Sequence, residues 1–133
     1  MGQSLEVRIE QVGPSTAKGI ARTHSVLIDR PVAKGGEDRG PLGGEYLLLA
    51  LGGCFMSNLL AAIRAREAAV SDVRITVNGT IEESPDRFTR LTLTIAATHQ
   101  DAELMKKLVT IAERSCIVTN TLRSGVSIAL MIE

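Results

Sequence analysis

The sequence predicts an α+β domain in which antiparallel β-sheets wrap around a long central helix and a second helix. Two observations favour this class. Segments with alternating apolar and polar residues are grouped before and after one long apolar helix, whereas a parallel α/β fold alternates single strands with helices. The chain has 133 residues, 44% of them hydrophobic, which suffices for one core, so we expect a single domain over residues 1–133.

Short strands are predicted first. Leu5, Val7 and Ile9 alternate with charged residues, which is the period of a half-buried strand. A turn rich in glycine, proline and serine follows, and residues 20–22 and 26–29 then predict two short strands or one bent strand. The start of the chain is therefore typical of an antiparallel meander.

A long loop is predicted over residues 30–44, because this stretch contains two prolines and five glycines, too many for a regular element. The loop carries Arg30 and Arg39. Loops of this length in small domains are often functional, although a plain surface excursion is an equal alternative.

The longest predicted element is a helix over residues 45–69, whose apolar residues recur at helical spacing around much of its circumference. Between Tyr46 and Ile63 the strongly polar residues are Ser57 and Asn58. At about 1.5 Å per residue this stretch reaches roughly 27 Å, so a membrane span is an alternative. The Ser-Asn pair and two glycines argue against it, and the strands need this helix to pack on, so we expect no membrane partner.

The rest of the chain predicts a hairpin, two helices and a strand. Alternating apolar residues indicate antiparallel strands over residues 73–81 and 91–95. A helix over residues 101–114 begins on an aspartate, which is a good N-cap, and a shorter helical turn follows over residues 115–122. Alternation over residues 126–132 predicts a final strand.

The composition argues against several classes of function. Fifteen basic against fifteen acidic residues give no long-range field for phosphate backbones, and three aromatic residues cannot form a base-stacking platform, so no nucleic-acid partner is expected. No GxGxxG, GxxxxGK[ST] or GxSxG motif is present. We therefore expect neither a bound nucleotide cofactor nor a serine-hydrolase site.

The chain has two cysteines, Cys54 and Cys116, too few for a disulfide-rich fold. Its polar first ten residues lack the apolar segment of a signal peptide, so we expect a cytoplasmic protein. In that compartment cysteines are reactive thiols, metal ligands or inert core residues. A metal site would also need His24 and His99, and no CxxC or HxxxH spacing supports one, so no metal is predicted.

Each cysteine has a structural and a chemical interpretation. Cys54 follows Gly52 and Gly53, which either permit close packing or leave the sulfur open to a substrate, and position alone favours an inert core cysteine. Cys116 lies at the start of the short helix, where amide dipoles lower the pKa of a thiol, or it fills space under a turn. The two can act together only with Cα atoms within about 7 Å.

Glu45 is the candidate acidic residue. A carboxylate in the first turn of a helix is stabilised by the helix dipole, and this structural role is a sufficient explanation. Glu45 could instead hold Arg30 or Arg39, since an arginine held by a carboxylate can keep a nearby thiol ionised and bind a peroxide oxygen. Solvated loop arginines are the commoner case.

Two segments carry a family resemblance. Gly43–Ala61 (GGEYLLLALGGCFMSNLLA) and Ser115–Leu122 (SCIVTNTL) resemble the two cysteine motifs of the osmotically inducible protein C (OsmC) and organic hydroperoxide resistance (Ohr) family. Residues 29–41 resemble the linker of its OsmC-like members. The resemblance covers essentially the whole chain and implies an intertwined α+β homodimer, with active sites at the dimer interface.

The resemblance also implies thiol peroxidase chemistry in oxidative stress defence. Cys54 matches the peroxidatic cysteine, which attacks an organic hydroperoxide, and Cys116 matches the resolving cysteine, which closes a disulfide. Family enzymes activate the first thiolate with an arginine and a glutamate, and a dithiol reductant resets the pair. We expect this chemistry to need no metal and no bound organic cofactor.

One position departs from the family pattern. The family glutamate follows a proline and lies one residue before Glu45, where this chain has Gly43 and Gly44. A shift of one residue on a helix turns a side chain by about 100°. Glu45, Arg30 and Arg39 are the candidate activating groups. The alternative function is a dimeric small-molecule-binding protein with little or no peroxidase activity.

Overall fold

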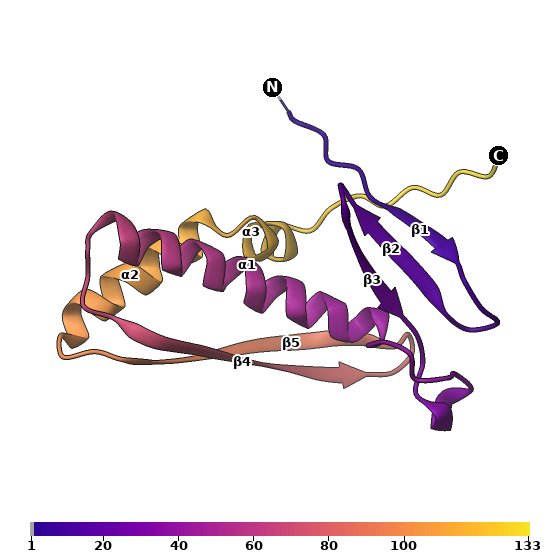
Figure 1. Cartoon of the computed structure of the whole chain (residues 1–133), viewed down its shortest axis with the longest axis horizontal. Helices are drawn as coiled ribbons and strands as arrows, with labels where there is room; N and C mark the ends of the chain where they lie inside the picture. The colour runs from indigo at the N-terminus through magenta and orange to yellow at the C-terminus, as the bar shows by residue number, and fades with distance from the viewer. Residues whose placement is uncertain (1) are drawn as a thin grey trace. The chain divides into compact units, whose positions relative to one another are not determined.

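The computed structural model describes residues 2–133, and the chain divides into two compact units. The first unit extends to Leu47, and the second comprises Leu48–Glu133. The boundary falls inside helix α1, Gly43–Ala65, so this helix contributes its first residues to one unit and the remainder to the other (Figure 1).

The first unit contains a three-stranded antiparallel sheet in the order β1-β2-β3. Its strands are β1 (Arg8–Gln11), β2 (Ala17–Ala21) and β3 (His24–Ile28). The predicted meander is confirmed, but the prediction that its first strand begins at Leu5 is wrong. The pairing with β2 starts at Arg8, opposite Ile20, and β2 ends at Ala21, so no residue of β2 is left to pair with Leu5.

The predicted loop follows β3 and contains a single 3-10 turn, η1 (Val32–Lys34). The loop folds back on the end of β3. Asp29 N–H donates to Pro41 O at 3.1 Å, and Asp38 N–H donates to Arg30 O at 2.9 Å. A Cβ at Gly36 would collide with the carbonyl of Arg30, so only glycine permits this closure.

The second unit contains the antiparallel hairpin of β4 (Ser71–Glu82) and β5 (Arg87–Thr98), as predicted. Helices α1 and α2 (Ala102–Ser115) lie on one face of the hairpin, and α3 (Ile117–Ser124) follows α2 (Figure 1). The core lies between them and consists mainly of aliphatic side chains: Phe55, Leu59, Ala62, Ile63, Met105, Leu108, Ala112 and Cys116. Half-buried hairpin residues such as Ile75 and its cross-strand partner Ile95 complete it.

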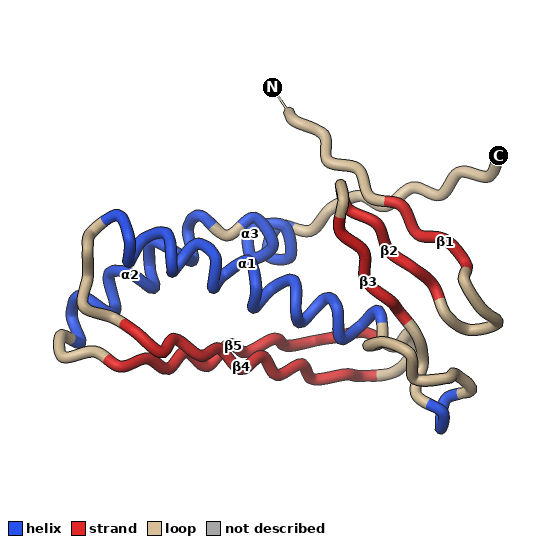
Figure 2. The backbone as a smooth tube through the Cα atoms, in the orientation of Figure 1, coloured by secondary structure: helices blue, strands red, loops and turns tan. Residues whose placement is uncertain are grey.

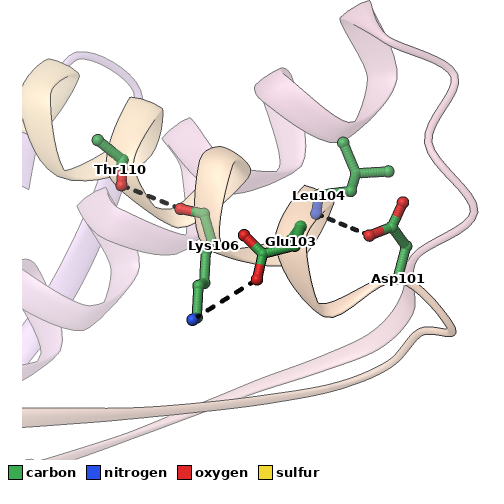
Figure 3. A network of polar contacts seen from close by, with 5 residues as sticks. All are labelled: Asp101, Glu103, Leu104, Lys106 and Thr110. Atoms are coloured by element: carbon green, nitrogen blue, oxygen red, sulfur yellow. Dashed lines mark hydrogen bonds and ion pairs between the residues drawn. The ribbon is translucent and has the colours of Figure 1, made fainter.

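Helix α2 begins as the sequence predicts. Asp101 is its N-cap, and the Asp101 carboxylate accepts a hydrogen bond from Leu104 N–H at 3.0 Å (Figure 3). Further along the exposed face, the Lys106 ammonium lies 3.8 Å from the Glu103 carboxylate (Figure 3). The Thr110 hydroxyl donates a hydrogen bond to the backbone carbonyl of Lys106. This end of the helix is therefore stabilised by local contacts, independently of the core.

Helix α1 ends earlier than predicted. The sequence predicts helix to residue 69, but the helix stops at Ala65, and Glu67 has a φ of 46°. Ala68 N–H donates to Ile63 O at 3.0 Å, and Glu67 N–H donates to Arg64 O at 3.2 Å. These two bonds form a Schellman motif, which satisfies the last helical carbonyls.

The C-terminal residues differ most from the prediction. Residues 126–132 were expected to form a final strand, and that prediction is wrong for this chain, because residues 125–133 have no regular secondary structure (Figure 2). Ile128, Leu130 and Ile132 are 84%, 92% and 99% exposed. Strands are stabilised by cross-strand pairs, and within the described residues this segment pairs with neither sheet.

Candidate active site

Cys54 lies in the second unit, inside α1, with its side chain half-buried. The two preceding glycines have different environments. Gly52 is buried, and a Cβ there would be 2.9 Å from Val77 Cγ2 on β4, so this glycine permits close helix–sheet packing. Gly53 is exposed, and a Cβ there would meet nothing within 4 Å. The second glycine therefore leaves open space beside Cys54.

Asn58 adjoins Cys54 one helical turn later. Its side-chain amide donates to Cys54 O at 2.9 Å and lies 3.7 Å from Cys54 Sγ. A polar side chain among so many apolar ones has a local explanation here, because its amide hydrogen bonds are made back to the preceding turn.

Cys116 lies at the junction of α2 and α3 and is fully buried. It is the N-cap of α3, with extended backbone angles of −76° and 107°. Its sulfur accepts a hydrogen bond from Thr119 N–H at 3.5 Å, as an N-cap side chain does with the third residue of a helix. The predicted position of Cys116 at the start of a short helix is confirmed.

The two cysteines lie together in the second unit as free thiols. Cys54 packs against the hydrophobic core cluster that contains Cys116. The structure therefore places the two candidate reactive residues of the sequence at the same hydrophobic core, although they are separated by a hairpin and a helix along the chain.

The surroundings of Cys116 favour its thiolate. Burial is the largest influence and raises the pKa of the Cys116 thiol. The Thr119 hydroxyl, the Thr119 and Val118 backbone N–H groups and the Cys54 thiol act in the opposite direction, and together they bring the pKa below its ordinary value. Hydrogen bonds to the charged form outweigh desolvation at this position.

Glu45 has a structural contact in the first unit. Its carboxylate accepts a hydrogen bond from Leu42 N–H at 2.8 Å, just before the helix begins. This is the return half of a capping box, in which an acidic side chain satisfies an unpaired N–H at the helix start. Within residues 2–133, Glu45 forms no ion pair with Arg30 or Arg39.

Arg30 and Arg39 are both held through their backbones by Asp29. The Asp29 carboxylate is 2% exposed and accepts hydrogen bonds from Arg30 N–H at 2.7 Å, Arg39 N–H at 3.2 Å and the Thr16 hydroxyl at 2.7 Å. Burial raises the pKa of Asp29, but these hydrogen bonds hold it well below its usual range. Asp29 therefore closes the arginine-bearing loop as an ionised group.

Within the described part of the chain, no three side chains of histidine, cysteine, aspartate or glutamate come together to hold a metal ion. A separate cavity of about 440 Å³ opens at the end of the second unit where α2 begins, and neither cysteine lines it. His99 is one of the residues that line this cavity.

A protein-family model matches most of this chain. The family model described as OsmC-like protein matches residues 35–131, more than half of the chain. The chain belongs to the OsmC family. A comparison with curated proteins gave no match.

Solved structures in and around the OsmC family share the fold. An OsmC-like protein from Mycoplasma pneumoniae has a TM-score of 0.80 at 16% identity, over 92% of this chain and 89% of that chain. OhrB of Bacillus subtilis, an organic hydroperoxide resistance protein, has a TM-score of 0.63 at 18% identity, over 91% of each chain. One from Elizabethkingia anophelis has a TM-score of 0.69 at 16% identity, over 92% and 90%. These likenesses confirm the α+β fold class.

Three polar residues of this OsmC-family chain were missed as site residues: Asn58, Thr119 and Asp29. For two of them, the position in the sequence relative to a cysteine could have identified them. Thr119 stands three residues after an N-cap cysteine, where the helix N–H meets the cap side chain. Asn58 stands one turn after Cys54 on an otherwise apolar helix. Asp29 has no comparable signal, because its partners lie 13 residues earlier and 10 residues later in the chain.

Proposed function

We propose that this OsmC-family protein is a thiol-dependent peroxidase that reduces organic hydroperoxides in the cytoplasm, in defence against oxidative stress. The observation that carries the proposal is that Cys54 and Cys116 are free thiols at the same hydrophobic core, with the Cys116 sulfur at a helix N-terminus. Neighbouring structures that carry the name organic hydroperoxide resistance protein support the same chemistry.

The difference in exposure assigns the two roles. Cys54 is half-buried beside the open space at Gly53, whereas Cys116 is fully buried. A substrate therefore meets Cys54 first. Cys54 attacks the distal peroxide oxygen, becomes a sulfenic acid and releases an alcohol. Cys116 then attacks the sulfenic sulfur, water leaves, and a disulfide forms that an external dithiol reductant opens by exchange.

An activating arginine belongs to this proposal. Arg30 and Arg39 lie on the loop that Asp29 closes, and either guanidinium supplies the positive charge that a peroxide oxygen needs. The proposed partner of the arginine is Glu45, whose carboxylate in the single chain caps α1 through Leu42.

The second unit leaves an apolar surface that supports a homodimer. Gly53, Ser57 and Ala61 form an exposed line of small residues on α1, and Leu60 beside them is 45% exposed. Small residues permit a close helix crossing with a second copy. The same helix is long and apolar enough to cross a membrane by composition, a criterion that core helices of soluble proteins also meet.

Turnover of an organic hydroperoxide in the presence of a dithiol reductant tests the proposal. We expect the full-length protein to consume tert-butyl hydroperoxide catalytically, Cys54→Ser to abolish turnover, and Cys116→Ser to stop at a sulfenic acid that a dimedone probe captures. A matched control is Thr110→Val, an exposed position on α2, which should keep full activity. Wild-type protein that leaves the hydroperoxide intact would refute the peroxidase assignment.

A second function has one observation in its favour. Gly44 stands at the usual glutamate position of the family, and the Glu45 carboxylate is engaged with Leu42 N–H. A dimeric protein that binds a small molecule without efficient peroxidase activity fits this departure. Restoring the family pattern with Gly44→Glu discriminates the two: a large gain in peroxidase rate would favour the binding protein, and an unchanged high rate would favour the enzyme.

A further inference from the structure

We propose that Asn58 orients the hydroperoxide: its side-chain oxygen accepts the O–H of the substrate and thereby places the oxygen that carries this hydrogen against the Cys54 sulfur. This role rests on the proposed function, because it adds a substrate-binding residue to the site of that same cysteine. It gives a chemical purpose to a polar side chain that lies one helical turn after Cys54 on α1.

The orientation of the Asn58 amide is set by two atoms of Cys54. A helical side chain lies over the turn before its own residue, so Asn58 covers the turn that contains Cys54. Its Nδ2 donates to Cys54 O at 2.9 Å and to Cys54 Sγ at 3.7 Å. Both of these atoms are acceptors, so the amide nitrogen, and not the amide oxygen, faces them. The two N–H groups of the amide are therefore both in use.

The amide oxygen of Asn58 is left as an accessible acceptor. It is on the other branch of the amide from Nδ2, so it points away from the Cys54 carbonyl. Within residues 2–133 no N–H or O–H group donates to Asn58 Oδ1, and this oxygen is not closed off from solvent. A fixed acceptor without a partner, beside a reactive sulfur, is suited to bind a donor of the substrate.

Helix stability does not require an asparagine at this position. In an α-helix each carbonyl accepts the backbone N–H four residues later, so Cys54 O already has a partner in the backbone of Asn58. Asparagine is also a weaker helix former than alanine or leucine. The side chain therefore lowers helix propensity without satisfying a backbone group that lacks a partner, which favours a chemical role.

The chemistry of a hydroperoxide fits this acceptor. The molecule R–O–O–H has one hydrogen-bond donor, and that donor is on the distal oxygen, the atom that the sulfur attacks. When the O–H donates to Asn58 Oδ1, the distal oxygen is held beside Cys54 Sγ. The open space at Gly53, where a Cβ would meet nothing within 4 Å, remains for the alkyl group.

The hydrogen bond to Asn58 persists through the oxidation step. The Cys54 thiolate, whose proton has gone to solvent, attacks the distal oxygen, so that the S–O bond forms while the O–O bond breaks. The sulfur loses two electrons and the peroxide gains them. The alkoxide takes a proton from solvent and leaves as an alcohol. The distal oxygen keeps its hydrogen and becomes the sulfenic S–OH, which still donates to Oδ1, so Asn58 neither gains nor loses a proton.

The test compares two reagents that react with the same sulfur. Cys116→Ser leaves Cys54 as the one thiol of the full-length chain, which has two cysteines. In this background, dimedone capture followed by intact mass spectrometry gives the rate constant for sulfenic acid formation with tert-butyl hydroperoxide. Methyl methanethiosulfonate also modifies Cys54 but has no O–H or N–H group, so its rate constant does not depend on a hydrogen bond to Oδ1.

Asn58→Leu removes the amide at nearly constant size. We expect it to lower the rate constant for tert-butyl hydroperoxide by about tenfold, the size of one lost hydrogen bond, and to change the rate constant for methyl methanethiosulfonate far less. Thr110→Val is the matched control and should change neither, because Thr110 also donates to the carbonyl four residues earlier but lies on α2. An unchanged hydroperoxide rate constant in Asn58→Leu, or an equal fall with both reagents, would overturn the proposal.

Asn58→Asp keeps an oxygen acceptor but brings a negative charge beside the sulfur. Because this charge repels a thiolate, we expect both reagents to react more slowly with this variant. Unchanged rate constants with both reagents would show that the side chain does not lie beside the Cys54 sulfur, and would also overturn the proposal.

Failure of this role and failure of the proposed function give different results. A wild-type protein that leaves tert-butyl hydroperoxide intact would refute the peroxidase function and the role of Asn58 with it. An active wild-type protein, together with an Asn58→Leu variant that forms the sulfenic acid equally fast, would refute the role of Asn58 alone.

Discussion

At the residue scale, the sequence located the cysteines but not the groups that govern them. Cys54 and Cys116 lie in recognisable motifs, and the structure places both at the same hydrophobic core. In the sequence, Thr119 and Asn58 are only polar residues near those motifs. Whether they donate a hydrogen bond to a cysteine depends on the direction of the N–H or O–H group, which residue spacing alone does not give. Asp29 is the extreme case, since it gathers partners from residues far apart along the chain.

The ionised Asp29 predicts an acid-sensitive loop. Its pKa in the folded chain lies below the ordinary value of 3.8, so its contribution to stability is full above that value and is lost as the pH falls towards the folded-state pKa. We expect Asp29→Asn to be less stable than wild type at pH 7, with a difference that shrinks as the pH is lowered through about 4. Urea unfolding at several pH values measures this.

Thr16→Val is the companion variant for that measurement. It removes the hydroxyl that donates to Asp29 at 2.7 Å while keeping the carboxylate, so the pH dependence should persist at a lower overall stability. If the wild-type advantage over Asp29→Asn stayed constant from pH 7 to pH 3, the carboxylate would not be the group that closes the loop.

At the element scale, periodicity predicted the type of nearly every helix and strand. The meander, the long helix, the hairpin and the two later helices follow from residues that sit on their own faces. The end of α1 was misplaced, because a Schellman motif at Glu67 has no glycine to mark it. The C-terminal strand was wrong for a different reason: alternation shows that a segment can form a strand, while pairing decides whether it does.

Gly52 offers a prediction about how α1 packs on the hairpin. An alanine would improve helix propensity by about 1 kcal/mol, but its Cβ would press on Val77 Cγ2 at 2.9 Å, and overpacking of this kind costs about 1–3 kcal/mol. We expect Gly52→Ala to lower the free energy of unfolding by about 1 kcal/mol. Denaturant unfolding gives the value.

The control is the same change in a Val77→Ala background, where the space is open. There Gly52→Ala should become neutral or stabilising, so that the double-mutant cycle shows coupling between the two positions. Equal costs in both backgrounds would mean that the contact with β4 is not the reason for this glycine.

At the scale of the whole molecule, the chain has the fold of the OsmC family at identities of 16–18% to the structures compared. A fold can persist at such identities because patterning and core volume are retained while individual residues change. The exposed apolar positions, Leu5 in the first unit and Ile128 to Ile132 at the C-terminus, have no cover within the described chain. Apolar surface of this extent is typical of an interface.

We therefore expect a dimer of about twice the 14.2 kDa chain mass in solution without detergent. Analytical ultracentrifugation gives the mass directly. Ile128→Asp combined with Leu130→Asp should weaken the dimer, since burial of a charge in an apolar interface is unfavourable. Lys107→Asp on the exposed side of α2 is the matched control and should leave the dimer intact. A monodisperse monomer at high protein concentration, or a protein that stays soluble only in detergent, would contradict this prediction.

The central claim is that Cys54 and Cys116 work as one redox pair, and the most direct measurement is a peptide map after one equivalent of organic hydroperoxide. Reduced protein is mixed with tert-butyl hydroperoxide, the remaining thiols are alkylated, and the digest is analysed by mass spectrometry. We predict that both thiols disappear together and that a peptide cross-linked between Cys54 and Cys116 replaces the two alkylated peptides. Two cysteines that remain fully alkylated, or oxidation of one with the other left free, would contradict the claim.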